Sequence, residues 1–392
     1  MAADALLSPD AVAQELDSLG RATGVEAETD DHTGDEEIRE PFDPEKIDVV
    51  TRTPTVDLLL SRIRTQRIDL QPDFQRHAGI WTARAKSRLI ESLLLRIPLP
   101  TLYAAEAQDE SWAIVDGIQR LTTITEFVEP AVIGTQPLRL IDLEYLDKCE
   151  GMLFGDLPGR LQTRLREAEL VVHLIRLGTP EAVKFNIFAR INTGGLPLSA
   201  QELRHALIPG EARQYLKVWA KSPEFLQATA GSIRSDRMAD REMVLRFAAF
   251  RLTAPGAYAN QDFDHFLRDA MKRLNQLPPA QVQRLERELK SAMATASEVF
   301  GTHAFRKRNP DGKGGRFPIN KALFEAVSVN LAVLPEPQRQ LLVQRRRRLE
   351  KMFLELMKDA SFQIAISQGT GDVAKVKRRF QRVRALFAGV VE

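Results

Sequence analysis

Cysteine and histidine are scarce in this sequence, and both scarcities limit its chemistry. Cys149 has no second thiol with which to form an internal disulfide, so the composition fits a reducing compartment and we expect a cytoplasmic protein. The six histidines lie far apart, and none pairs with another at the spacing of metal ligands. We therefore expect neither a zinc site nor an HNH-type nuclease site within the chain.

Long apolar runs and several well-known motifs are also absent. No run reaches the roughly 18–20 apolar residues that a helix needs to cross a bilayer, so no membrane contact is expected. The start, Met1-Ala2-Ala3-Asp4, lacks the basic and apolar stretches of a signal peptide. The chain contains no Gly-x-x-x-x-Gly-Lys-Ser/Thr, no Gly-x-Gly-x-x-Gly after a strand and no Gly-x-Ser-x-Gly, which excludes a P-loop protein and argues against a nucleophile elbow.

Charge is unevenly distributed along the chain. Residues 1–45 hold 14 Asp or Glu and 2 Lys or Arg, which leaves 39 acids and 53 bases in residues 46–392. An acidic leader thus precedes a basic body, although the net charge is only +2. A basic body attracts nucleic acid or other anions, whereas the alternative is an ordinary soluble body with a solvating leader.

Three regions follow from composition and hydrophobic periodicity. Residues 1–41 form an acidic leader, which we expect to be disordered apart from a short helix near Ser8–Leu19. Residues 42–210 mix strand and helix patterns, and residues 211–392 form a basic region with almost only helical patterns. The sequence therefore predicts an α+β N-terminal domain followed by an all-α C-terminal domain.

Within the mixed region the expected helices cover 55–64, 82–96, 121–128, 182–191 and 199–206, and the expected strands cover 68–76, 101–105, 111–115, 138–143 and 170–177. A capping box, Ser199 with Glu202, opens the last of these helices. The expected C-terminal helices cover 213–219, 241–251, 261–275, 280–300, 321–331, 338–357 and 372–387.

The first candidate site lies where an apolar strand runs into Asp116-Gly117 and then into a helix. Glycine permits a sharp turn, and the unpaired amides of a helix N-terminus favour phosphate. Arg120 adds a bidentate phosphate donor, and Asp116 suits a metal ion, a ribose hydroxyl or a water. The alternative is an ordinary strand–turn–helix with a surface ion pair.

Two further segments have the composition of anion-binding loops. Gln75-Arg76 follows an extended stretch, and Asn192-Thr193-Gly194-Gly195 follows a helix. Consecutive amides in such a glycine turn can form a nest for phosphate, but the same residues also make an ordinary helix C-cap. For Glu202, the capping box is a simpler explanation than a role as base or metal ligand.

A basic segment in the C-terminal region is the candidate for contact with nucleic acid. It contains Arg306, Lys307, Arg308, Lys313 and Arg316, and residues 339–384 add 13 Lys or Arg against 4 Asp or Glu. Such density can follow a phosphate backbone. The alternative is that these faces are solvated or meet an acidic partner.

Taken in order, the motifs resemble a known family. They are Pro72-Asp73-Phe74-Gln75-Arg76, Ile97-Pro98-Leu99-Pro100, Asp116-Gly117-Ile118-Gln119-Arg120 and Ile191-Asn192-Thr193-Gly194-Gly195 with Glu202-Leu203-Arg204. The resemblance is to domain-of-unknown-function family 262, the GmrS-type domain of the ParB/sulfiredoxin-like superfamily, over residues 50–210.

This resemblance implies a ParB-like fold that binds a nucleoside triphosphate with Mg²⁺, in bacterial anti-phage defence beside nuclease domains or subunits. Asp116, Gln119 and Arg120 would then be catalytic, with Asp116 on the metal. Gln75, Arg76, Gly117 and Asn192–Gly195 would hold the nucleotide. Ile118 replaces a glutamine of the family pattern, which places hydrolysis in more doubt than binding.

Three functions remain open at this point. The first is a nucleotide-binding or NTP-hydrolysing component of a defence, restriction or toxin–antitoxin system that contacts DNA and a separate nuclease or toxin subunit. The second is a non-catalytic DNA- or protein-binding subunit, such as an antitoxin or assembly factor. The third is a metal-dependent DNA nuclease using Asp73, Glu91 or Asp116. The nucleotide, the partner and the oligomeric state are left open.

Overall fold

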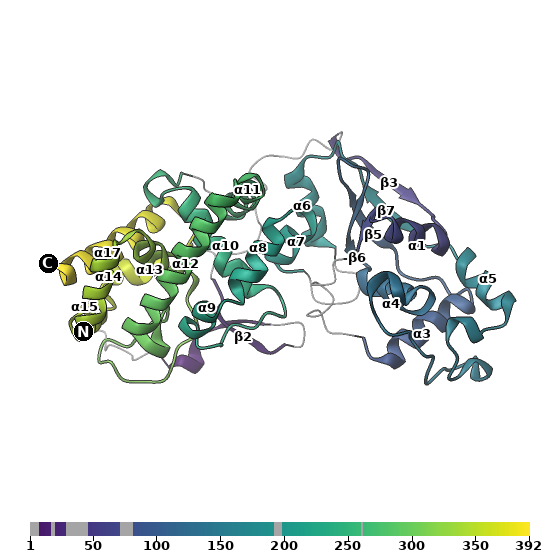
Figure 1. Cartoon of the computed structure of the whole chain (residues 1–392), viewed down its shortest axis with the longest axis horizontal. Coiled ribbons are helices and arrows are strands. Elements are labelled where there is room, and N and C mark those ends of the chain that lie inside the picture. Colours follow the sequence, from purple (N-terminus) through teal and green to yellow (C-terminus); the bar gives the residue numbers. More distant parts are fainter. Residues whose placement is uncertain (1–7, 17–19, 29–45, 71–80, 192–197, 260–261) are drawn as a thin grey trace. The chain divides into compact units, whose positions relative to one another are not determined.

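The computed structural model describes residues 8–16, 20–28, 46–70, 81–191, 198–259 and 262–392 (Figure 1). The chain divides into two compact units. Residues 38–207 form a mixed unit, and residues 208–392 form a helical unit together with the N-terminal residues 1–37. Within the described residues, no helix has both the length and the apolar composition needed to span a bilayer.

The mixed unit is α+β, as the sequence predicts. Its strands are β3 (Val49–Arg52), β4 (Ile68–Asp69), β5 (Leu102–Glu106), β6 (Trp112–Asp116) and β7 (Val172–Ile175). Its α-helices are α1 (Val56–Arg64), α3 (Ala83–Leu94), α4 (Ile118–Val128), α5 (Gly159–Glu167), α6 (Glu181–Arg190) and α7 (Ala200–Leu207).

The five strands form one mixed sheet in the order β3-β7-β5-β6-β4. β3 runs antiparallel to β7, and β5 runs antiparallel to β6. β5 and β7 are parallel, as are β4 and β6. Because β4 and β6 are parallel, their C-terminal ends lie at the same edge of the sheet, and the antiparallel β5 begins there too. Whether this arrangement is ParB-like stays a prediction.

Local signals explain why the helices begin where they do. The side chain of Thr55 accepts from the Leu58 amide at the start of α1, and Thr82 accepts from Ala85 at the start of α3. Both threonines satisfy amides that have no partner inside the helix. Helix α3 then buries one apolar face that includes Ile90 and Leu94, as its periodicity predicts.

Two expectations for this unit need correction. Residues 138–143 form no strand: Leu138 and Leu140 are buried, but their amides bond to the carbonyls of Glu126 and Met152 rather than to a sheet. Their alternating apolar pattern therefore reflects packing of an irregular segment. Helix α4 begins at Ile118 rather than at residue 121, directly after the turn at Gly117.

Gly117 makes the turn from β6 into α4 and has no room for a side chain. Its φ is +93°, in the left-handed region that glycine adopts most easily. A Cβ placed here would lie 2.0 Å from Cδ2 of Leu102 and 3.2 Å from Nη2 of Arg120. Gly117 thus allows β5, β6 and α4 to approach one another closely.

The helical unit contains the helices α8 (Ala212–Ala220), α9 (Pro223–Ala228), α10 (Ala239–Leu252), α11 (Phe263–Gln276), α12 (Pro279–Phe300), α13 (Lys321–Val333), α14 (Glu336–Gln344), α15 (Arg346–Leu356), α16 (Ala360–Ser367) and α17 (Val373–Val391). The single helix expected over 338–357 is divided at Arg345, whose guanidinium donates to the carbonyl of Val390, 2.7 Å away.

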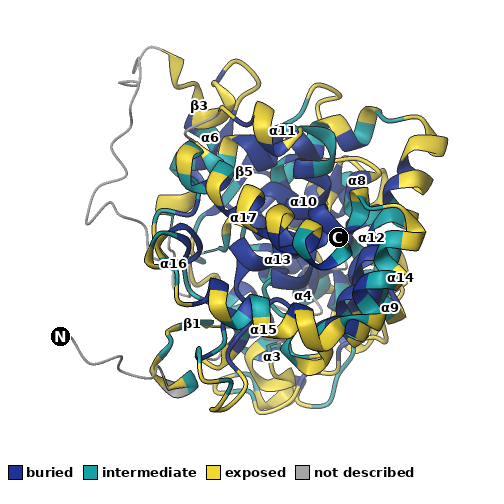
Figure 2. Cartoon of the chain, turned by 90° about the vertical axis from the view of Figure 1, so that its left-hand side faces the viewer, coloured by how far each residue is buried: buried dark blue, intermediate teal, exposed yellow. Residues whose placement is uncertain are grey.

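Helices α10 and α13 form the interior of this unit. Figure 2 shows both in dark blue, and nearly every residue of each is buried. A helix that is buried on all sides must satisfy its polar side chains internally. Arg246 on α10 and Glu325 on α13 do so, because Nη1 of the guanidinium lies 2.7 Å from Oε1 of the carboxylate.

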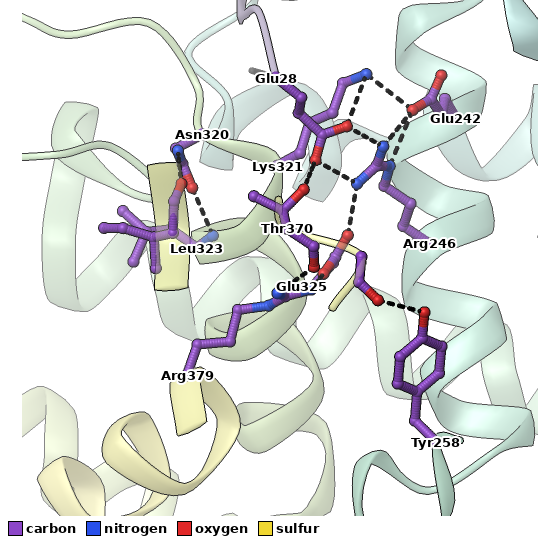
Figure 3. A network of polar contacts seen from close by, with 12 residues as sticks. Glu28, Glu242, Arg246, Tyr258, Asn320, Lys321, Leu323, Glu325, Thr370 and Arg379 are labelled. Carbon is purple, nitrogen blue, oxygen red and sulfur yellow. Dashed lines mark hydrogen bonds and ion pairs between the residues drawn. The ribbon is translucent and has the colours of Figure 1, made fainter. Parts of the chain in front are cut away.

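The N-terminal segment departs most from expectation. Instead of being disordered, its described residues form a short 3-10 helix (Pro9–Ala11) and two antiparallel strands, β1 (Gln14–Leu16) and β2 (Ala22–Glu26). The amide of Glu26 bonds to the carbonyl of Ile319, so this segment packs on the helical unit. Composition pointed to disorder because acidic side chains offer little apolar surface, but buried cations compensate the charge of Glu15, Glu26 and Glu28 (Figure 3).

Substituting Gly117 tests the turn. We expect Gly117→Ala to lower the free energy of unfolding by at least about 2 kcal/mol, because a left-handed alanine is strained and its methyl group overlaps Leu102. Urea unfolding followed by circular dichroism measures the change. Gly178→Ala is the matched control, since nothing lies within 4 Å of its added methyl. Equal stability of the two variants would contradict this account of the turn.

The charge of Glu28 should contribute stability that depends on pH. Burial alone raises the pKa of this carboxyl, but Arg246 and Lys321 outweigh it and lower the pKa from 4.5 to about 2. The folded chain therefore keeps Glu28 charged at pH values where the unfolded chain has taken up a proton. This stability is present above pH 4.5 and is lost as the pH falls toward 2.

We expect Glu28→Gln to cost about 3 kcal/mol at pH 7, and the difference from the wild type to shrink steadily between pH 4.5 and pH 2. Urea unfolding across this range gives the measurement. Glu355→Gln removes a carboxylate whose side chain is 69% exposed and should change little at any pH. A pH-independent effect of Glu28→Gln would argue against the ion pair.

Candidate functional site

The candidate site lies at the edge of the mixed sheet where β4 and β6 end. Asp116 is the last residue of β6, and α4 starts two residues later. The amide of Leu121 bonds to the carbonyl of Gly117, which leaves the preceding amides of the first turn outside the helical bonding pattern. These amides and the helix dipole favour an anion at this end of α4.

Arg120 is engaged within the protein rather than extended toward solvent. Its Nη2 lies 2.7 Å from Oδ2 of Asp116 and 3.3 Å from the carbonyl of Thr101, and its Nη1 donates to the carbonyl of Pro100. Burial lowers the pKa of Arg120, and Asp116 opposes that shift. The arginine thus fastens the start of β5 to α4 and orients the carboxylate.

Asp116 is the more accessible partner of this pair. Its side chain is 32% exposed, whereas that of Arg120 is 9% exposed. Gln119, on the first turn of α4, is also partly exposed. A ligand that approaches this edge would therefore meet Asp116 before Arg120.

Ile118 occupies a different environment from the one expected for a site residue. It is 4% exposed and belongs to the apolar interior. Its side chain therefore packs in the interior and does not line the accessible surface of the turn. The expectation that Ile118 stands in for a ligand-facing amide is not supported by this burial.

A row of side chains crosses the sheet at the level of Asp116. The register pairs Asp116 with Tyr103, Tyr103 with His173 and His173 with Thr51, from four neighbouring strands. The rings of Tyr103 and His173 are 5.2 Å apart, and the hydroxyl of Thr51 lies 3.0 Å from Nδ1 of His173. We call these four residues the cross-strand row. The sequence of each strand by itself did not indicate this row, because strand pairing brings its four residues together.

Helix α7 contacts β6 and carries buried polar side chains. The predicted capping box is confirmed: the Ser199 amide donates to the Glu202 carboxylate at 2.6 Å, and the Glu202 amide donates to the Ser199 hydroxyl at 3.1 Å. Arg204, from the Glu202-Leu203-Arg204 motif, is also buried, as are Gln201 and His205, which sequence reasoning did not single out. Arg204 donates through Nε to Gln201 at 2.9 Å. Glu202 is therefore a helix cap.

Several candidate residues lie outside the described part of the chain. They are Asp73, Gln75, Arg76, Asn192, Thr193, Gly194 and Gly195. The convergence of Arg76 with Arg120 consequently stays a prediction. Leu70, the last described residue before this gap, directly follows β4, whose C-terminal end shares the edge with Asp116.

Glu91 is a structural residue and not an accessible metal ligand. It is 3% exposed, and its carboxylate accepts from the amides of Glu144, Tyr145 and Leu146 at 2.7 to 3.0 Å. Burial raises its pKa, but these bonds outweigh burial and lower it. Across the described residues, no group of three or more His, Cys, Asp or Glu is placed to hold a metal ion.

Two of the five members of the candidate nucleic-acid segment, Arg306 and Lys307, are engaged inside the helical unit. Arg306 is 2% exposed and donates to the carbonyls of Thr229 and Phe317. Lys307 is 6% exposed and pairs with Glu26 at 2.5 Å. Both side chains are therefore used inside the fold, and their contact with nucleic acid stays a prediction.

The other three members of that segment are less deeply placed. Arg308 pairs with Glu350 at 3.2 Å. Lys313 and Arg316 are exposed, as are Arg346 and Arg347 on α15 and Arg378 and Arg384 on α17. Exposed basic side chains are therefore found on α15 and α17 as well as in the loop.

Comparison with protein-family models gives a match for the mixed unit. Residues 56–209 match the family model described as the GmrSD restriction endonuclease, N-terminal domain. No curated protein and no solved structure matches the chain. The matched range covers α1 to α7 and includes the Asp116 turn. The match supports a GmrS-type family for this part of the chain and suggests a component of a restriction or anti-phage system.

Proposed function

We propose that the mixed unit binds a nucleoside triphosphate with Mg²⁺ at the sheet edge formed by β4, β6 and the start of α4. The observation that carries the proposal is the partly exposed Asp116 carboxylate, held by a buried arginine beside the N-terminus of a helix. A family match to a restriction endonuclease domain over residues 56–209 supports a role in bacterial restriction or anti-phage defence. The cytoplasmic setting is part of the same proposal.

Each part of the turn has a role in this proposal. The amides of the first turn of α4 and the close approach permitted by Gly117 would bind phosphate oxygens. Asp116 would hold the Mg²⁺ ion, which when bound neutralises the charge of the phosphates. Gln119 would donate to a phosphate oxygen or orient a water. Gln75, Arg76 and Asn192–Gly195 belong to the proposed site through the family resemblance alone.

Arg120 takes a different role from the one first expected. Since its guanidinium contacts Asp116 and two backbone carbonyls, we assign it as a positioning residue. The cross-strand row adds a feature that suits a nucleotide, because the tilted pair Tyr103 and His173 offers aromatic surface next to Asp116.

Contact with DNA is the second part of the proposal. Since Arg306 and Lys307 are buried, the contact would use Lys313, Arg316 and the exposed arginines of α15 and α17. A separate nuclease or toxin subunit would supply any cleavage. The oligomeric state is not part of the proposal.

A non-catalytic binding subunit is the alternative function. The ion pair between Arg120 and Asp116 favours it, because this pair fixes both groups that were expected to act on the nucleotide. Metal-dependent cleavage by this chain ranks lowest, since Glu91 is enclosed by backbone amides. Plasmid DNA that stays intact with the purified chain under Mg²⁺ and Mn²⁺ would set cleavage aside.

Nucleotide binding is tested by calorimetry with Mg²⁺ and ATP, GTP, CTP or UTP. We expect one nucleotide to bind, and Asp116→Asn to weaken that binding at least about 10-fold in Mg²⁺ while changing metal-free binding much less. Phosphate release by the wild type distinguishes the hydrolase from the binding subunit. Lack of binding to all four nucleotides, with and without DNA, would overturn the proposal.

The positioning role of Arg120 has its own test. We expect Arg120→Lys to lower the free energy of unfolding by about 2 kcal/mol, because lysine cannot reach Asp116 and both carbonyls together. Urea unfolding and the nucleotide titration are compared for this variant and for Arg346→Lys, a control on an exposed arginine. Unchanged stability with weakened nucleotide binding would instead place Arg120 on the phosphates.

A further inference from the structure

The N-terminal segment places one carboxylate on a set of buried donors in the helical unit (Figure 3). Nη1 and Nη2 of Arg246 lie 3.1 and 2.5 Å from the two carboxylate oxygens of Glu28. Nζ of Lys321 lies 3.7 Å away, and the hydroxyl of Thr370 donates to the same carboxylate. A guanidinium fork, an ammonium and a hydroxyl also form a suitable donor set for a phosphoryl group.

Within the helical unit's own helices, this cluster has an excess of positive charge. Three buried cations, Arg246, Lys321 and Arg379, face two carboxylates, Glu242 and Glu325. Against this excess of one charge the N-terminal segment supplies two carboxylates, Glu28 and Glu15, and Glu15 lies 2.5 Å from Lys321. Helices α10, α13 and α17 and Thr370 therefore form a cationic site that needs an anion from outside these helices.

Glu28 is more exposed than the donors around it. Its side chain is 24% exposed, whereas those of Arg246 and Lys321 are 4% and 5% exposed. It follows the end of β2, beyond the bonds that join Gly24 and Glu26 to Ile319.

The segment has a separate anchor upstream of Glu28. Glu26 pairs with Lys307 at 2.5 Å and accepts from Asn320 at 3.1 Å. Withdrawal of Glu28 therefore does not require release of β2. A local movement is enough to open the donor set of Arg246, Lys321 and Thr370.

We propose that Arg246, Lys321 and Thr370 form a binding site for a phosphate monoester, and that Glu28 occupies it as an intramolecular ligand. A monoester is favoured over the internal phosphates of a nucleic-acid backbone because the donors lie deep, so that the anion must project from the end of a molecule. A 5′-phosphorylated nucleic-acid end and a free phosphate share this chemistry. The site is independent of the one proposed at Asp116.

Vacating the site tests the proposal. In the full chain, we expect Glu28→Ala to bind inorganic phosphate at least about 10-fold more tightly than the wild type, measured by calorimetry. At matched ionic strength, phosphate should raise the Tm of this variant by roughly 5 °C relative to chloride and that of the wild type by less. If acetate raises the Tm of this variant as much as phosphate does, the site is one for carboxylates rather than for a phosphoryl group.

Matched variants test whether the phosphate response of Glu28→Ala comes from the proposed site. Glu355→Ala removes one exposed carboxylate and should respond to phosphate like the wild type. Adding Arg246→Lys to Glu28→Ala should abolish the gain, because lysine keeps the charge but lacks the bidentate fork. An oligonucleotide with a 5′-phosphate that binds Glu28→Ala more tightly than its 5′-hydroxyl counterpart would identify a nucleic-acid end as the source; equal binding would identify free phosphate.

The wild type provides a test that does not depend on the variant folding. A phosphate monoester that displaces Glu28 should speed amide hydrogen exchange at Ala27, the residue before Glu28, whose amide bonds to the carbonyl of Ala13 at 2.9 Å. Chloride at the same ionic strength should not. A phosphate response of Glu28→Ala no larger than that of Glu355→Ala would overturn the proposal. If Glu28→Ala does not fold, unchanged hydrogen exchange at Ala27 in the wild type would overturn it.

Discussion

Taking a guanidinium or ammonium group out of water is costly, and this cost constrains both units of the protein. In the mixed unit, Arg120 is buried and is compensated by Asp116 and by two backbone carbonyls. In the helical unit, Arg246 and Lys321 are compensated by carboxylates from α10, α13 and the N-terminal segment. The positions of the acidic residues follow from these buried cations.

This constraint changes how the conspicuous polar residues are interpreted. Arg306 and Lys307 stand in a stretch that a nucleic acid should attract, yet they hold backbone carbonyls and Glu26 inside the fold. Glu91, a potential metal ligand by residue type, instead gathers three amides of one loop. These three side chains are therefore used within the fold rather than presented to a ligand.

The proposed nucleotide site and the proposed phosphate site differ in construction. Asp116 belongs to a turn that sheet geometry opens to solvent, with a helix N-terminus beside it. Arg246 and Lys321 lie beneath a segment of the same chain, which covers them with its own carboxylates. The sheet geometry thus leaves Asp116 accessible to a ligand, whereas carboxylates of the same chain cover Arg246 and Lys321.

The sequence alone determined the features that depend on neighbours along the chain. Periodicity and caps predicted α1, α3, α6 and α7 and most of the C-terminal helices, and the strand–turn–helix at Asp116-Gly117 was predicted from an apolar run followed by glycine. These signals are local, since propensity, capping and turn chemistry act within a few residues. The family resemblance rested on the same local motifs.

Only the tertiary structure decided which charges are buried and which residues meet across the sheet. Thr51, His173, Tyr103 and Asp116 come together through strand pairing, which periodicity does not specify. The N-terminal segment folds because cations more than 200 residues away need its carboxylates, as the pairing of Glu28 with Arg246 shows. Composition could not reveal this, because disorder and compensation of buried charge both use acidic residues.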